Sequence, residues 1–221
     1  MRRFWRENSL SLVFLVLLLL ALGGQAWAGW RDFDEQQVAD GLATVSFLRY
    51  VTSSSFAVDV MENWQSEFLQ FFLYVFLTVW LVQKGSPESK EPGDVGPGND
   101  EEEKLGEHAS PKTPKLARRR GLVGLLYAHS LCTAFGVLFL LSWAGQAVAG
   151  RSDYDEQQLA NLQDPVSLGA YLGRADFWSR SLQNWQSELL AVGSFAVLAI
   201  WLRQRGSPES KPVGAPHDHT G

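Results

Sequence analysis

Two glutamates are the residues best placed to do chemistry in this sequence. Glu67 and Glu188 each end the string Asn-Trp-Gln-Ser-Glu, which begins at Asn63 and again at Asn184. Each precedes an apolar run, so a helix entering a membrane here would place the carboxylate about 4.5 Å inward of the tryptophan. An ionisable group within a membrane span is by default a candidate functional site. The pattern is therefore compatible with a small transporter or an ion-binding protein.

The same glutamates also have a structural interpretation, which we favour. Gln25 and Gln146 stand at the ends of two other apolar segments, at a similar predicted depth. A hydrogen bond between Gln25 and Glu67, repeated between Gln146 and Glu188, would pin two helices together and satisfy both groups. The six candidate binding residues of this outer polar cluster are Gln25, Asn63, Glu67, Gln146, Asn184 and Glu188.

A polar path through the membrane is not supported by both glutamate-containing segments. On a helical wheel Gln70, Tyr74 and Thr78 continue the face of Glu67. The corresponding residues of the other segment are Ala191, Phe195 and Ala199. No nucleophile–base pair or strong metal-ligand cluster is present. We therefore expect no catalytic residue, no metal site and no cofactor, and we do not expect an enzyme.

The elements that carry these residues are written twice. Gly24–Ala39 resembles Gly145–Ala160, the Asn-Trp-Gln-Ser-Glu string recurs, and Gly-Ser-Pro-Glu-Ser-Lys begins at Gly85 and again at Gly206. Every pair is 121 positions apart, which indicates a gapless duplication. We call a residue and the residue 121 positions later counterparts. The duplication predicts an all-α protein with four transmembrane helices, formed by two tandem parallel-repeat helical hairpins.

The apolar segments predict the four spans unequally. Leu10–Ala28 and Gly121–Ala149 carry no full charge and are long enough to cross a bilayer. Phe68–Val82 and Leu189–Leu202 are shorter than the hydrocarbon core, so the preceding glutamate string must be drawn into the membrane. The basic start and Ala26-Trp27-Ala28 resemble a signal peptide. The second repeat has the same ending deep inside the chain, so we favour a retained helix.

Basic residues predict the direction of the spans. With cytoplasmic N- and C-termini, only five of the 19 Lys and Arg residues fall outside: Arg31, Arg49, Arg151, Arg174 and Arg180. This distribution follows the positive-inside rule and indicates a multi-pass protein of the cell membrane.

The two outer loops predict small helical caps. Asp34 and Asp155 are candidate N-caps for helices that start at the next residue. Short helices are expected over 46–51 and 167–172, followed by long helices that Ser55 and Asp176 would cap.

Composition divides the chain into four parts. Residues 1–90 and 118–211 are the two membrane repeats. Residues 91–117 form an acidic, proline-rich linker and residues 212–221 a tail, and neither composition can bury a core. We expect both to be disordered and cytoplasmic.

The repeated strings resemble those of a family of bacterial membrane proteins classed as a domain of unknown function. The resemblance rests on Gly-Gln-Ala-x-Ala-Gly, Asn-Trp-Gln-Ser-Glu and Gly-Ser-Pro-Glu-Ser-Lys, in this order and twice over. It implies a bacterial cell-membrane location and no activity. We expect a structural or interaction component of the cell envelope. Its expected partners are the lipid bilayer and a membrane protein or a second copy of itself, with no nucleic acid.

Overall fold

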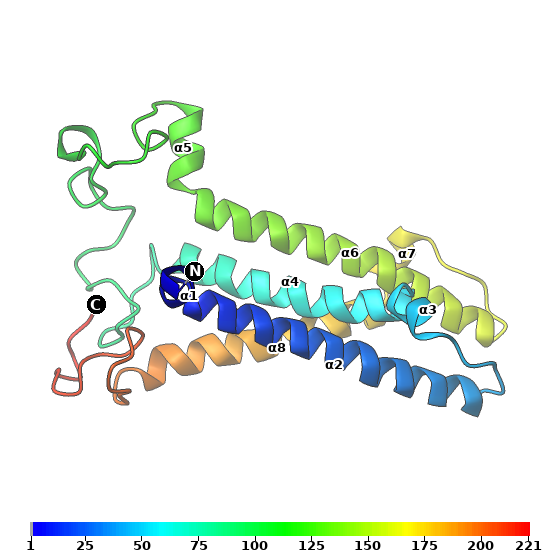
Figure 1. The fold of residues 1–221 in the computed structure, drawn as a ribbon. Coiled ribbons are helices and arrows are strands. Elements are labelled where there is room, and N and C mark those ends of the chain that lie inside the picture. The colour runs from blue at the N-terminus through cyan, green and yellow to red at the C-terminus, as the bar shows by residue number, and fades with distance from the viewer. Residues whose placement is uncertain (1) are drawn as a thin grey trace. The chain divides into compact units, whose positions relative to one another are not determined.

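The computed structural model describes residues 2–221, and every regular element in that range is helical. The prediction of an all-α protein is therefore confirmed. The elements in chain order are α1 Arg2–Glu7, α2 Ser9–Ala39, α3 Phe47–Val51, α4 Ser54–Leu77, the 3₁₀ turn η1 Gly106–His108, α5 Leu122–Ala128, α6 Ser130–Ala160, α7 Leu168–Leu172 and α8 Ala175–Leu198 (Figure 1).

The chain divides into two compact units, and both repeats contribute to each. The first unit comprises the chain up to Val60 together with Gly145–Tyr171. It contains α2, α3, the start of α4, the end of α6 and most of α7. The second unit comprises Met61–Ala144 and Leu172–Gly221. It contains most of α4, the start of α6, and α8 with the linker and tail.

The first long helix of each repeat continues well beyond its predicted span. Both α2 and α6 are 31 residues long, about 46 Å at the rise of an α-helix. Figure 1 shows each as an uninterrupted coil. The prediction that Asp34 and Asp155 begin new helices was wrong, because both residues lie inside these continuous helices. No proline interrupts either segment, and the acidic turns extend the helix past the apolar run.

Both helices stop by the same mechanism, a left-handed residue after the last turn. Gly41 has φ +74°, and Leu42 N–H donates to Gln37 O over 2.8 Å. In the second repeat Leu162 adopts φ +57°, and Gln163 N–H makes the counterpart bond. This is the Schellman arrangement, which favours glycine at the left-handed position. Leu162 therefore holds a conformation that is strained for a residue with a Cβ.

The short helices of the two caps are confirmed as α3 and α7. Ser46 caps α3, its Oγ accepting from Arg49 N–H. The caps predicted for the following helices were wrong. Ser53, not Ser55, accepts from the backbone N–H of Phe56, and Asp176 lies in the first turn of α8 after Arg174. Ser55 is used in a tertiary hydrogen bond instead.

The second long helix of each repeat ends earlier than its apolar run. α4 stops at Leu77 and α8 at Leu198, each followed by a three-residue turn that carries Trp80 or Trp201. Each helix has 24 residues, about 36 Å. Among the helices of residues 2–221, only α2 and α6 combine the length and apolar composition of a membrane span.

Candidate functional site

The two caps are held by one clamp that occurs in both repeats. In the first, Trp30 Nε1 donates to the carbonyl of Val45 over 2.8 Å, and Asp34 Oδ1 accepts from Val45 N–H over 2.8 Å. Both residues lie on one face of α2, four positions apart. Trp30 and Asp34 together satisfy the backbone N–H and the carbonyl of Val45 and fasten the returning loop to α2.

The second repeat builds the clamp with one changed side chain. Arg151, the counterpart of Trp30, donates from Nε to the Val166 carbonyl over 2.7 Å. Asp155 accepts from Val166 N–H over 2.7 Å and pairs with Arg151 at 2.9 Å. A donor at this position and an aspartate one turn later are sufficient for the clamp. The aspartate of the Asp-Glu-Gln-Gln string thus has a tertiary role, not the local role that its sequence suggested.

A buried tyrosine closes each cap against a glycine of the Gly-Gln-Ala-x-Ala-Gly motif. The Tyr171 hydroxyl would lie 2.5 Å from a Cβ placed on Gly150, and the Tyr50 hydroxyl would lie still closer to a Cβ placed on Gly29. Tyr171 is fully buried, and its ring packs on Tyr154 with centroids 5.6 Å apart. Only glycine leaves room for the tyrosine, so the motif residue is explained by packing.

The first unit also joins the two repeats through hydroxyl–carboxylate contacts. Ser54 Oγ donates to Glu156 Oε1 over 2.9 Å, and Ser55 Oγ bonds to Asp153 Oδ1. Ser54 and Ser55 begin α4 of the first repeat, and both acids lie on α6 of the second. The contact therefore holds the start of α4 against the end of α6.

The six residues of the predicted outer polar cluster have different environments. Gln146 is fully buried, whereas its counterpart Gln25 is exposed. Asn63 and Glu67 are exposed, whereas their counterparts Asn184 and Glu188 are half-buried. Within the second unit Glu67 and Glu188 lie close enough to repel each other. The predicted bond between Gln25 and Glu67 joins residues of the two different units and stays a prediction.

The buried polar contact of the second unit involves a residue that sequence analysis missed. Trp185 Nε1 donates to Gln65 Oε1 over 2.8 Å, and Gln65 is 0% exposed. Gln65 Nε2 in turn donates to the Glu62 carbonyl. The string around Gln65 is identical to that around Gln186, which is exposed. No signal in the sequence distinguishes the two glutamines.

An ion-pair network lies one turn from this contact. Arg180 Nη1 of α8 lies 3.3 Å from Glu62 Oε2 of α4, and its Nε lies 3.5 Å from Asp176 Oδ1. All three side chains are partly shielded from solvent. The counterparts of Arg180 and Glu62 are Asp59 and Gln183, so duplication does not reproduce this network.

At the other end of α4 and α8, the two Gly-Ser-Pro-Glu-Ser-Lys copies adopt the same turn. Ser89 Oγ accepts from Gln83 N–H over 2.8 Å, and Ser210 Oγ accepts from Gln204 N–H over 2.9 Å. The repeated serine is therefore used to close the turn. This local requirement accounts for part of the identity between the two copies.

The glutamates of these two turns approach each other beside a cavity. Burial raises the pKa of the Glu88 carboxyl above its ordinary 4.5, and the charge of Glu209 raises it further. The Tyr74 hydroxyl is buried near Glu88 without a hydrogen bond of normal geometry. The adjacent cavity of about 340 Å³ is lined mainly by apolar side chains. Its further polar lining residues are Gln70, Thr78, Gln83, Ser86 and Ser89.

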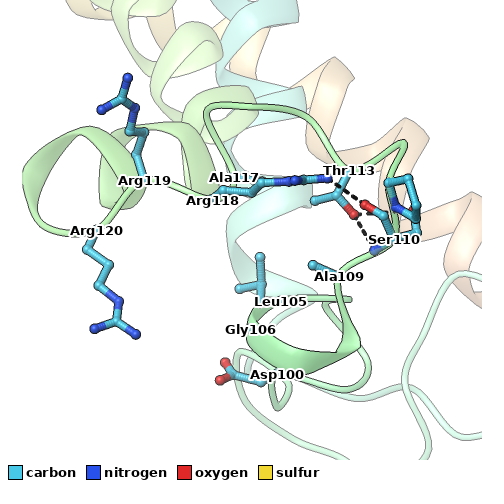
Figure 2. Close-up of a pocket in the computed structure, with 11 residues that line it drawn as sticks. Asp100, Leu105, Gly106, Ala109, Ser110, Thr113, Ala117, Arg118, Arg119 and Arg120 are labelled. Atoms are coloured by element: carbon cyan, nitrogen blue, oxygen red, sulfur yellow. Dashed lines mark hydrogen bonds between the residues drawn. The ribbon is translucent and has the colours of Figure 1, made fainter.

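A hollow of the second unit lies in the linker and just before α5. Figure 2 shows its wall, formed by segments around Asp100, Ser110 and Arg118–Arg120. Arg118 Nη2 donates to the Ser110 carbonyl over 2.6 Å. Arg119 and Arg120 also line the hollow (Figure 2).

Comparison with known proteins gives a family without an assigned activity. No curated protein and no solved structure matches the chain significantly. A family model described as a domain of unknown function (DUF6766) matches residues 1–221. Since this match covers the whole sequence, the chain belongs to the DUF6766 family.

Proposed function

We propose that the protein is a multi-pass component of a bacterial cell membrane that acts through structure and interaction. Four spans, contributed by α2, α4, α6 and α8, would leave both termini in the cytoplasm. The apolar side chains of α2 support membrane placement, because Leu10–Leu20 are mostly exposed, as lipid-facing side chains must be. Each of α4 and α8 has 24 residues and is about 36 Å long, which is more than the hydrocarbon thickness of about 30 Å.

One observation carries the interaction role: the caps are firmly built and yet present apolar side chains. In the first cap Val38, Leu42 and Leu48 are exposed, and in the second Leu159 and Leu162. The clamps on Val45 and Val166 hold these surfaces in a defined shape. Exposed apolar groups on an ordered surface are typical of protein or membrane contacts. No catalytic or cofactor chemistry is needed for such a role.

Photo-crosslinking in native membranes tests this proposal. A benzophenone amino acid at Leu48 or Leu159 should give discrete protein adducts. The same group at Leu10, equally exposed but on the span, should give lipid adducts. A further Leu42→Ser substitution should reduce the adduct from position 48. Lipid adducts alone from both caps would refute the interaction role.

A small transporter or ion-binding protein is the alternative, and one observation favours it. Glu67 and Glu188 from the two repeats approach each other within the second unit. Two neighbouring carboxylates could share a cation or a proton. The double substitution Glu67→Gln and Glu188→Gln separates the two functions. A loss of ion flux in reconstituted vesicles, with unchanged stability and unchanged cap adducts, would establish the alternative.

A further inference from the structure

We propose that two copies of this chain associate through Trp64 of one copy and Gln186 of the other, with the reciprocal contact between the remaining two residues. This inference goes beyond the interaction role of the caps and rests on the membrane placement proposed above. It follows from the hydrogen bond between Trp185 and Gln65, which forms within the chain. Their counterparts, Trp64 and Gln186, form no such bond with each other.

The internal contact is directional. Trp185 of the second repeat donates to Gln65 of the first, and Gln65 is completely buried by it and its neighbours. The counterpart of Gln65 is Gln186, and the counterpart of Trp185 is Trp64. We call Trp64 and Gln186 the converse pair. Trp64 is 39% exposed and Gln186 is exposed. Neither side chain forms a hydrogen bond within the described part of the chain, residues 2–221.

The apolar residues deeper in the span show the same asymmetry. A Cβ on Gly136 would lie 3.2 Å from the Phe72 ring, so a large side chain fits over a glycine. The counterpart pair is Leu15 and Gly193. Leu15 is 50% exposed, and nothing lies within 4 Å of a Cβ placed on Gly193. The converse contact thus also offers one large side chain and one open glycine.

A stacked aromatic pair, Phe71 and Phe135, also has apolar counterparts. Phe71 stacks on Phe135 with centroids 5.2 Å apart. Their counterparts are Val192 and Phe14, and Phe14 is strongly exposed. The converse residues are therefore complementary in hydrogen bonding, in size and in polarity.

A second copy is the occupant that matches all three properties. An amide that faces lipid without a partner is unfavourable, and a hydrogen bond to another helix relieves this cost. Each copy carries one Trp64 and one Gln186, so two copies close with two identical bonds, as twofold symmetry requires. The contact is confined to the spans. In the caps, the converse of Ser55 and Asp153 would set Asp176 against Asp32, two like charges.

Disulfide trapping in membranes tests the contact, with the internal pair as a matched control. In a Cys132→Ser background, the double variant Trp64→Cys and Gln186→Cys should yield a product of twice the monomer mass. The double variant Gln65→Cys and Trp185→Cys should crosslink within one chain and stay at monomer mass. Co-expression of singly substituted chains with different tags provides a second readout. Only the mixture of Trp64→Cys and Gln186→Cys chains should give a product carrying both tags.

Three results would overturn the inference. The first is that the converse pair fails to crosslink while the internal control forms its disulfide, which shows that no second copy occupies the surface. The second is that the converse pair crosslinks at monomer mass, which means that the converse contact forms inside one chain. Neither result affects the cap adducts from Leu48 and Leu159, so failure here is distinguishable from failure of the proposed function. A heterologous protein trapped at Trp64 in place of the second copy also refutes the inference.

Discussion

Gly150→Ala is the substitution whose effect the packing of the second cap predicts most directly. The added Cβ would lie 2.5 Å from Tyr171 Oη and 3.2 Å from Val58 Cγ2. Tyr171 and Val58 are both buried, so neither can move into solvent. Overpacking of this kind costs about 1–3 kcal/mol. Alanine is favoured over glycine inside a helix by about 1 kcal/mol, so the net loss should be about 0–2 kcal/mol.

A matched control separates the two contributions. Gly24 lies in α2 with nothing within 4 Å of the Cβ position, so Gly24→Ala should keep only the gain of about 1 kcal/mol. The difference between the two variants therefore measures overpacking, about 1–3 kcal/mol. Adding Tyr171→Phe to Gly150→Ala removes the closest atom and should recover part of the loss in a double-mutant cycle.

Reversible unfolding in mixed micelles, followed by far-UV circular dichroism, provides the free energies. Equal stabilities for Gly150→Ala and Gly24→Ala would refute the explanation of the glycine motif by tyrosine packing. A double-mutant cycle without coupling between positions 150 and 171 would refute it independently.

Four further perturbations test other parts of the structure. Leu162→Gly should raise the free energy of unfolding by about 1 kcal/mol, because Leu162 is left-handed and 96% exposed. The opposite change, Gly41→Leu, should lower the free energy of unfolding. Equal midpoints of the two variants in chemical unfolding would contradict the assignment of strain to Leu162. Asp34→Ala should cost about 1–3 kcal/mol by leaving Val45 N–H unsatisfied and should speed hydrogen exchange at that amide, whereas exposed Glu35→Ala should not. Gln65→Leu should destabilise the monomer in detergent by about 1–3 kcal/mol because Trp185 loses its acceptor. Gln186→Leu should change the free energy of unfolding by no more than about 0.5 kcal/mol. Similar losses for the two variants would disprove the asymmetry between the two glutamines. Burial and the charge of Glu209 raise the pKa of Glu88, so the folded state holds this proton at pH values where the unfolded state has released it. Stability should therefore fall as pH rises from about 4.5 through the raised pKa, and Glu88→Gln should flatten that part of the thermal-midpoint profile.

The sequence determined the helical class, the duplication and the positions of the cap helices. These depend on local features: apolar runs, turn residues and a constant offset of 121 positions. The short helices α3 and α7 followed from such patterns and were confirmed. Helix ends were less accurate, because α2 continues through the acidic turn that was expected to break it.

Asp34 illustrates why local rules failed there. An aspartate before Glu-Gln-Gln is a good N-cap when its carboxylate has no other donor. In the fold the loop returns and presents Val45 N–H, which takes that carboxylate while the helix passes through. The competing donor is eleven residues away in the chain, outside the range of any capping rule.

Tertiary structure alone decided which member of each duplicated pair is buried. Gln65 and Gln186 stand in identical strings, and so do Trp64 and Trp185, yet one glutamine accepts a buried hydrogen bond and the other is exposed. Identical local sequence gives both residues the same propensities. Burial depends on which side chains of other helices pack against each residue. The two copies of the string meet different neighbours in the fold, so one glutamine is buried and the other is exposed.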